Sequence, residues 1–290
     1  MSGWVLIGAP WDCSGTGRGE ERAPGALRRA GIGRLAGADA GDAATVIDSR
    51  RRDEATGVLA LPETIAAARA LATMLATVLA SHPGRRPLVV GGDCSLLLGV
   101  FAGATGRTGL WMLDGHPDYV DGPSSETGET ADLELAVLTG DGPPGLTGDV
   151  PMVAARHVAL IGHRTEGLDE ASRSELARLP SGMLTIDAGA VRDDPRGAGA
   201  RAAAWAEPMP MWLHIDVDVL DPAAMPAVTY PQPGGPGFDQ LAAVLAPLAA
   251  SPRLAGVSIA DFRPDLDPDG RHAEALISLL DRAIFAADRL

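Results

Sequence analysis

The stretch WLHIDVDVLDP, residues 212–222, decides the fold that this sequence predicts. Its first four residues are mostly large and apolar, and they lead directly into Asp216 and Asp218. A short run without regular polar alternation is typical of a strand buried on both faces, as in a parallel sheet covered by helices. The stretch therefore predicts a central parallel strand that ends in acidic side chains.

The same pattern recurs along the chain. Each apolar run is followed by a turn-rich segment and then by an Ala- and Leu-rich stretch of helical length. The predicted strands are residues 4–7, 88–90, 110–113, 158–161, 212–215 and 256–259. This alternation indicates α/β architecture, a three-layer αβα sandwich with a mostly parallel central sheet. A TIM barrel would alternate in the same way, but it needs more strands than the sequence offers.

Two helices and three loops complete the prediction. Residues 62–80 and 271–290 carry apolar side chains at helical spacing, with Thr64 near the start of the first helix. The predicted surface loops, rich in Gly, Pro, Ser and Thr, are residues 121–130, 141–150 and 223–237. Because no repeat or linker interrupts the chain, residues 1–290 are expected to form a single domain.

The composition excludes several classes of protein. The 290 residues are 46% hydrophobic, enough for a sizeable core, and their formal net charge is −14. This charge has the wrong sign for binding a phosphate backbone, so no nucleic-acid partner is expected. Two cysteines are too few for a disulfide framework, and we find neither a basic, apolar leader nor an uncharged apolar window of ~18 residues. We therefore expect no membrane span and a cytoplasmic location.

Metal-ligating side chains follow two of the predicted strands. They are Asp114, His116 and Asp118 after one strand, and Asp216 and Asp218 after another. Residues two apart point the same way in an extended segment, and ligand sites in parallel sheets form at the carboxyl ends of strands. Four carboxylates in one pocket would repel each other unless cations neutralised them. The grouping predicts two divalent metal ions about 3.5–4 Å apart.

Each motif alone has a simpler explanation. Aspartate pairs commonly cap helices or stabilise turns, so Asp216 and Asp218 alone would not indicate a metal. Both motifs together, each directly after a predicted strand, favour metal binding. Asp221 precedes Pro222 and is expected to form a turn.

Three segments resemble the signature motifs of the arginase/agmatinase (ureohydrolase) family. They are GGDCS at 91–95, LDGHPDY at 113–119 and HIDVDVLDP at 214–222, in the family's order and spacing. Residues 7–28, IGAPWDCSGTGRGEERAPGALR, and 226–241, PAVTYPQPGGPGFDQL, also resemble family segments, so the similarity spans nearly the whole chain. The resemblance implies an arginase-like fold and a binuclear metal hydrolase.

Carried over residue by residue, the resemblance implies a ligand set. Asp114 and Asp216 would bridge two metals, Cys94 and Asp118 would complete one of them, and His116 and Asp218 would complete the other. Family members usually hold Mn²⁺ and hydrolyse a guanidinium or related amidine by attack of a metal-bridging hydroxide. The implied partner is a small guanidino substrate, and the implied assembly is a homo-oligomer, a trimer or hexamer.

Cys94 departs from the family pattern, which usually has His at this position. A thiolate is softer than imidazole and adds negative charge, so it favours Zn²⁺, Fe²⁺, Co²⁺ or Ni²⁺ relative to Mn²⁺. Alternatively, Cys94 is a small buried residue that contacts no metal. Metal identity therefore stays open.

A second departure removes the family's proton-carrying histidine. Residues 127–136 read TGETADLELA where the family has a segment like SGNxHGMxLA, and Ala131 stands at the histidine position. Because Ala cannot relay a proton, another group would have to substitute. The candidates are His163, Glu126, Glu129 and Asp132. Of these, His163 follows a predicted strand at the end of the sheet where ligand sites form.

Asp261, in SIADFRP, stands where the family has its guanidinium-binding carboxylate. A carboxylate can pair with a guanidinium through two hydrogen bonds. The alternative for Asp261 is a turn or capping role before Arg263. The predicted catalytic residues are Asp118, Asp261 and His163, and the other histidines are expected in loops, at caps or in buried hydrogen bonds.

The sequence predicts a metal-dependent amidinohydrolase that releases urea or a substituted urea from a guanidino or N-modified guanidino compound. The resemblance suggests arginine, agmatine, guanidinobutyrate, formiminoglutamate and N-hydroxyarginine as substrates. Two alternatives stay open: a metal-binding protein that kept the scaffold without turnover, and a metal-dependent hydrolase of another amide or amidine.

Overall fold

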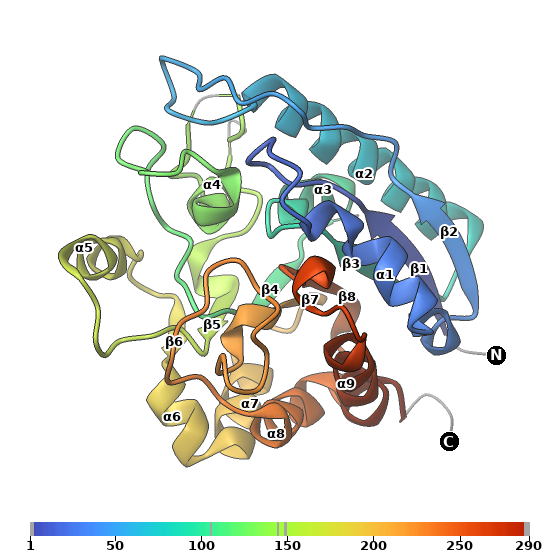
Figure 1. The fold of residues 1–290 in the computed structure, drawn as a ribbon. Helices are drawn as coiled ribbons and strands as arrows, with labels where there is room; N and C mark the ends of the chain where they lie inside the picture. The colour runs from blue at the N-terminus through green and yellow to red at the C-terminus, as the bar shows by residue number, and fades with distance from the viewer. Residues whose placement is uncertain (1–2, 105, 144, 148–149, 287–290) are drawn as a thin grey trace.

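A computed structural model describes residues 3–104, 106–143, 145–147 and 150–286. Within them, eight strands form one parallel sheet in the order β2-β1-β3-β8-β7-β4-β5-β6 (Figure 1). The strands are β1 Trp4–Ala9, β2 Ala38–Asp42, β3 Arg86–Gly91, β4 Gly109–Leu113, β5 Val158–Ile161, β6 Leu184–Ile186, β7 Met211–Asp216 and β8 Leu254–Ala260. All six predicted strands are present, and the predicted αβα sandwich is confirmed.

Helices cover both faces of the sheet (Figure 1). They are α1 Ala23–Arg29, α2 Leu61–Ser81, α3 Leu96–Gly103, α4 Glu134–Thr139, α5 Glu170–Arg178, α6 Ala188–Asp193, α7 Pro195–Ala204, α8 Phe238–Ala249 and α9 Arg271–Leu280. Successive strand residues alternate between two buried clusters: Trp4 and Leu6 belong to one, Val5 and Ile7 to the other. The first cluster contains side chains of α1 and α6 to α9, and the second contains side chains of α2, α3 and α4. Both faces of the strands are therefore buried.

Helix α2 confirms the predicted amphipathic helix, and Thr64 lies in its first turn. Its buried residues Ala67, Leu71, Leu75 and Val78 recur at three- or four-residue spacing and pack against the second cluster. By length and composition α2 could cross a membrane, and it is the one described helix of which this is true. The regular buried face is that of a core helix.

Three predicted features differ from the structure. The outer strands β2 and β6 escape the prediction because β2 reads ADAGD, a run of residues depleted in strands, and β6 has only three residues. The predicted helix over 271–290 is α-helical only to Leu280, where a π-helical turn, Asp281–Phe285, follows. Residues 287–290 lie outside the described residues. The predicted loops contain no α-helix and no strand of the sheet, with residues 144 and 148–149 outside the described residues.

Candidate metal centre

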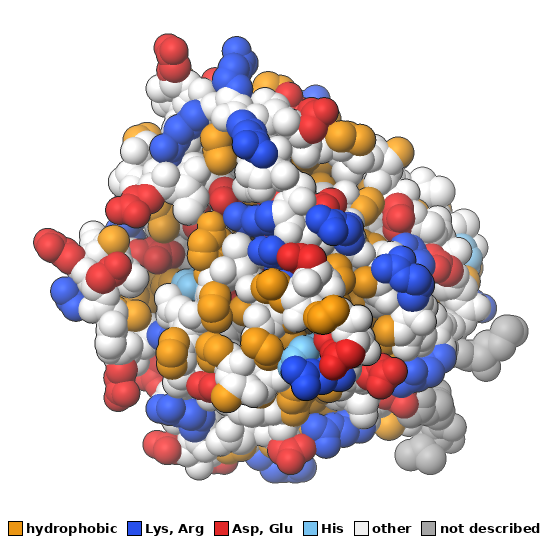
Figure 2. Space-filling model, viewed as in Figure 1, with side chains coloured by type: hydrophobic (Ala, Val, Ile, Leu, Met, Phe, Trp, Pro, Cys, Tyr) orange, Lys and Arg blue, Asp and Glu red, His pale blue; other side chains and the backbone are white. Residues whose placement is uncertain are grey.

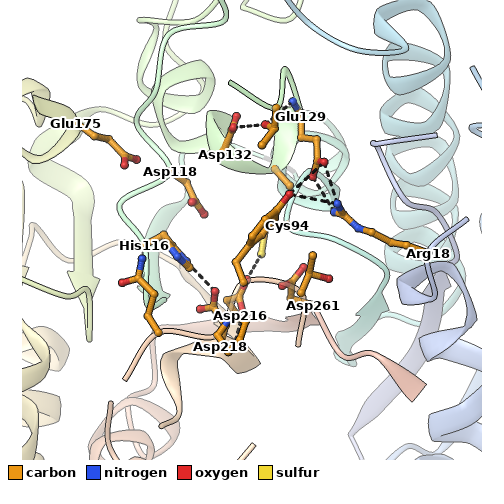
Figure 3. Close-up of a pocket in the computed structure, with 16 residues that line it drawn as sticks. Arg18, Cys94, His116, Asp118, Glu129, Asp132, Glu175, Asp216, Asp218 and Asp261 are labelled. Carbon is orange, nitrogen blue, oxygen red and sulfur yellow. Dashed lines mark hydrogen bonds and ion pairs between the residues drawn. The ribbon is translucent and has the colours of Figure 1, made fainter. Parts of the chain in front are cut away.

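The four central strands all end at the candidate site. Strands β3, β8, β7 and β4 are neighbours and run in the same direction, so their carboxyl ends lie side by side. The site residues that end or follow these strands are Cys94 after β3, Asp261 after β8, Asp216 and Asp218 at β7, and Asp114, His116 and Asp118 after β4. Figure 3 shows most of these side chains converging on one cavity.

The segment after β4 turns tightly and aims its side chains at the site. The backbone N–H of His116 donates to Asp114 Oδ1 at 2.7 Å, and His116 Nδ1 lies 2.7 Å from Asp218 Oδ2. Asp118 has a φ of 48°, a left-handed conformation that is uncommon for non-glycine residues, although aspartate adopts it more often than most. The predicted convergence of the three side chains is present.

Hydrogen bonds connect the end of β7 to the segment that follows β4. The N–H of Asp218 donates to Asp216 Oδ1 at 2.7 Å, and the N–H of Gly115 donates to Asp218 Oδ1 at 2.9 Å. Asp221 forms the predicted turn, since its carboxylate accepts hydrogen bonds from the N–H groups of Ala223 and Gly234. These bonds orient the carboxylates before any ion binds.

Arg164 holds together the backbone segments next to the site through hydrogen bonds. Its guanidinium donates to the carbonyl oxygens of Gly162, Asp218, Val219, Leu220 and Gln232 at 2.8–3.2 Å. The side chain is buried, and these five hydrogen bonds go to carbonyls rather than to carboxylates. Arg164 therefore positions the site while leaving its acidic side chains available.

Cys94 lies inside the acidic cluster. Its Sγ is 2.7 Å from Asp216 Oδ2 and 3.2 Å from His214 Nε2. His214 Nδ1 lies 2.8 Å from the hydroxyl oxygen of Ser258, so His214 has the buried, hydrogen-bonded role expected of it. Burial and the charges of Asp216 and Asp114 raise the pKa of the Cys94 thiol well above its ordinary value. Because a bound cation deprotonates a coordinating thiol, Cys94 would become a thiolate ligand only alongside a metal.

The carboxylates lack enough cationic partners of their own. Burial raises the pKa of Asp114, Asp118, Asp216 and Asp261 well above the ordinary value, and neighbouring carboxylates raise it further. Burial also acts to raise the pKa of Asp218, but the adjacent His116, the N–H of Gly115 and the charge of Arg164 together outweigh it, so the net shift is downward. Such a cluster is stable in ionised form only with added positive charge.

The residues present fit divalent metal ions. The cluster contains groups of ligand atoms within 4.8 Å of one another: Cys94, Asp114, Asp118 and Glu134; Asp114, His116 and Asp218; and Asp216, Asp218 and Asp261. Asp114 Oδ2 is buried and has no hydrogen-bond partner among the described residues. Carboxylate, imidazole and thiol donors at this spacing suit divalent ions, and they include all six predicted metal ligands.

Glu134 was missed by the sequence analysis. It is the first residue of α4, its side chain is fully buried, and it lies among Cys94, Asp114 and Asp118. The available signal was a single charged residue inside the apolar run from Leu133 to Leu138, whose side chains are otherwise buried. A lone acidic residue in an apolar helix is costly to bury without a partner.

A cavity of about 440 Å³ opens onto this cluster (Figure 3). Its lining residues are Arg18, Cys94, His116, Asp118, Thr127, Glu129, Ala131, Asp132, Glu175, Asp216, Asp218, Thr229, Tyr230, Pro231, Gln232 and Asp261. Ala131 lines the cavity at the position where the family resemblance places a histidine. The volume and the acidic lining suit a small cationic ligand.

Arg18 is the only Lys or Arg among the lining residues, and it is already paired. Its guanidinium donates to both carboxylate oxygens of Glu129 at 2.8 and 2.7 Å and also contacts Glu20. Its carbon Cζ lies 5.5 Å from the ring centroid of Tyr230. Neither Arg18 nor Tyr230 was among the predicted site residues.

The predicted catalytic residues separate into two sets. Asp118 and Asp261 line the cavity, and no described residue donates a hydrogen bond to the carboxylate of Asp261, whose φ is 68°. His163 is buried but does not line the cavity. It follows β5, which lies beyond β4 on the side away from the centre of the site. The order of the strands, which the sequence analysis did not establish, therefore separates His163 from the metal ligands.

Two of the suggested proton carriers line the cavity. They are Glu129, which is bound to Arg18, and Asp132. Asp132 Oδ2 accepts hydrogen bonds from the hydroxyls of Ser125 and Thr127, while its buried Oδ1 has no partner among the described residues. Burial raises the pKa of Asp132 to about 6. Glu126 lines a neighbouring groove instead.

Comparison with known proteins gives a consistent result. A family model described as "Arginase family" matches residues 2–286. An arginase of Brevibacillus brevis is 29% identical over 293 residues, which cover 95% of each chain. A formimidoylglutamase of Nocardia farcinica is 29% identical over 210 residues, covering 69% of this chain and 62% of the relative.

A solved structure shares the whole architecture. The arginase of Bacillus caldovelox superposes with a TM-score of 0.86 at 27% sequence identity, covering 98% of both chains. The fold of this chain is therefore similar to that of the solved relative over nearly its whole length.

Proposed function

Since the chain belongs to the arginase family, we propose that it hydrolyses a carbon–nitrogen bond of a guanidino or N-modified guanidino compound and releases urea or a substituted urea. One observation carries this proposal: six side chains of metal-ligating types group together at adjacent strand ends, beside a cavity with an acidic lining. All eight strands of the described chain share one sheet, from which we also infer a single domain over residues 1–290.

Two divalent metal ions would be held by the predicted ligands. By the family resemblance, Asp114 and Asp216 would serve both ions, Cys94 and Asp118 would hold one of them, and His116 and Asp218 would hold the other. When bound, the ions lower the pKa of water at the site toward neutrality and so supply the nucleophile. Mn²⁺ is the expected metal by family resemblance, and the soft Cys94 thiolate extends the range to Zn²⁺, Fe²⁺, Co²⁺ and Ni²⁺.

The charge of the cavity supports a cationic substrate. Seven carboxylates line it: Asp118, Glu129, Asp132, Glu175, Asp216, Asp218 and Asp261. The one lining arginine, Arg18, is paired with Glu129 and Glu20, which leaves acidic groups in excess. A guanidinium would be drawn into this field and paired by the available carboxylate of Asp261.

A proton must reach the leaving nitrogen, and Ala131 cannot deliver it. We infer that Asp132 carries the proton, because Asp132 lines the cavity, follows Ala131 in the chain and has an Oδ1 without a hydrogen-bond partner among the described residues, while two hydroxyls hold its other oxygen. Glu129 is a weaker candidate since Arg18 binds both of its oxygens.

Nucleic acid is not the expected partner. The net charge is −14, and on the face shown in Figure 2 acidic and basic side chains are interspersed without a continuous basic surface. A small cationic molecule suits both the overall charge and the cavity.

Product release across a panel of guanidino and amidine compounds tests the proposal. The panel contains arginine, agmatine, guanidinobutyrate, formiminoglutamate and N-hydroxyarginine, each assayed with Mn²⁺, Co²⁺, Ni²⁺, Zn²⁺ and Fe²⁺, and Asp118→Asn is the inactive control. We expect turnover of at least one compound by the wild type alone. Metal binding without turnover of any compound would contradict the proposal and favour a metal-binding protein.

A further inference from the structure

Glu134 is a buried carboxylate without a hydrogen-bond partner. Its side chain is fully buried at the start of α4, and neither Oε1 nor Oε2 has a partner among the described residues. Leaving a carboxylate in this state is costly, because the charged form loses its hydration without gaining a donor. A fold retains such a group where something binds it.

The surroundings of Glu134 offer other ligand atoms rather than a cation. Carboxylate and thiol atoms of Glu134, Cys94, Asp114 and Asp118 all lie within 4.8 Å of one another. No arginine in the described part of the chain forms an ion pair with Glu134, and the sequence contains no lysine. Four acidic groups thus share one small volume on the Cys94 side of the site.

We propose that Glu134 is a ligand of the metal ion that Cys94 and Asp118 bind. This inference rests on the two-metal site of the proposed function and adds a seventh ligand to it. The fully buried, unpartnered carboxylate is the observation that separates Glu134 from an ordinary acidic cluster.

The proposal makes the two metal positions chemically different. The ion beside Cys94 would have a thiolate and carboxylates as its proposed ligands, whereas the other ion would also be bound by the imidazole of His116. The added hard carboxylate offsets the softness of the thiolate, so the Cys94 side remains able to bind hard ions such as Mn²⁺. The two ions are therefore expected to bind with separable affinities.

A competing arrangement has Glu134 protonated and donating a hydrogen bond to Asp118. Glutamine has nearly the shape of glutamic acid and can make the same donation through its amide N–H. Glu134→Gln therefore preserves the competing arrangement but removes an anionic metal ligand, which makes it the discriminating substitution.

The test compares metal binding by wild type, Glu134→Gln and a control, Glu129→Gln. Glu129 lies on the same segment and lines the same cavity, but its carboxylate is bound to Arg18 and is not among the grouped ligand atoms. Mn²⁺ alone and Zn²⁺ alone are titrated against a chromophoric chelator, and metal content is measured after gel filtration. Circular dichroism of each variant reports whether it is folded.

We expect wild type and Glu129→Gln to retain two ions per chain. Glu134→Gln should bind one ion with an affinity lower by about 100-fold or more, because even residues that only support metal ligands contribute about 10–100-fold. Two ions with unchanged affinities in Glu134→Gln would overturn the inference and leave the proposed function standing. Fewer than two ions in the metal-saturated wild type would overturn both.

A second variant keeps the test decisive if Glu134→Gln does not fold. Glu134→Asp retains the charge but moves it one methylene away, and it should bind metal more weakly than wild type and more tightly than Glu134→Ala. Equal affinities of Glu134→Asp and Glu134→Ala would contradict a ligand role, since a metal ligand must respond to the presence of a carboxylate.

Discussion

Replacing Asp216 with asparagine should have opposite effects on the metal-free and the metal-loaded protein. Asp216→Asn keeps the shape of the side chain and its ability to accept the N–H of Asp218, but it removes a negative charge. In the metal-free protein this relieves repulsion with Asp218 and Asp261, whose ligand atoms lie within 4.8 Å. With metal present, the same change removes a ligand.

The size of the effect follows from the geometry. Two unit charges 4.8 Å apart repel by about 3 kcal/mol at an effective dielectric constant of about 20. Burial raises the pKa of Asp216 and Asp261, so partial protonation already relieves some of this repulsion. We therefore expect a gain on the order of 1–3 kcal/mol, or roughly 2–6 °C in Tm, for the metal-free variant.

Metal binding should reverse the order of stability. An ion at 100 times its Kd stabilises the wild type by about 2.7 kcal/mol. The variant binds the ion more weakly, so the same metal concentration stabilises it by less. Thermal unfolding is measured by calorimetry at pH 8, first with excess chelator and then with increasing Mn²⁺. Asp239→Asn, at an exposed carboxylate, is the control and should change stability by less than about 0.5 kcal/mol. A metal-free variant that is less stable than wild type, or one that keeps the full increment from Mn²⁺, would refute the reasoning.

Four further substitutions test individual residues. Cys94→His should abolish the sulfur-to-metal charge-transfer absorption of the Co²⁺-loaded protein and shift metal preference toward Mn²⁺, and a band that survives would exclude Cys94 as a ligand. Asp261→Asn should raise KM for the preferred substrate on the order of 10–100-fold through loss of a charge-assisted hydrogen bond, whereas an unchanged KM would remove its assigned role. Asp132→Asn should lower kcat about 100-fold or more while metal content stays at the wild-type level, and an unaltered kcat would exclude it as the proton carrier. Burial lowers the pKa of His163 to about 4, so its contribution to stability is present above about pH 6.5 and is lost as pH falls toward 4. Between about pH 6.5 and pH 4, the unfolding free energy of His163→Gln should fall by roughly 3 kcal/mol less than that of the wild type. The measurement is a plot of unfolding free energy against pH for each protein, and parallel plots would contradict this.

The central part of the fold could be predicted because its strands are buried on both faces. Apolar runs such as residues 110–113 and 212–215 have no polar alternation, which is typical of strands buried between two layers of helices, and they form β4 and β7. The outer strands could not be predicted in this way. Strand β2 is held by pairing with β1 rather than by burial of its own side chains, most of which are exposed.

The candidate site could be predicted as far as local spacing reaches. Asp114, His116 and Asp118 converge because alternate residues of one short segment point the same way, and the adjacency of β4 and β7 brings Asp216 to them. Glu134 could not be assigned by spacing, since the direction of α4 relative to Cys94 depends on how the chain returns after residue 118. Its charge in an apolar run was the only local sign.

The central claim is that this group of buried acids is tolerated because a pair of divalent cations lies among them. Crystals grown with Mn²⁺ and measured for anomalous scattering test it most directly. The map should contain two peaks about 3.5–4 Å apart, both within bonding distance of Asp114 and Asp216. A map without manganese at these side chains, with the aspartates bonded only to backbone amides, would contradict the account.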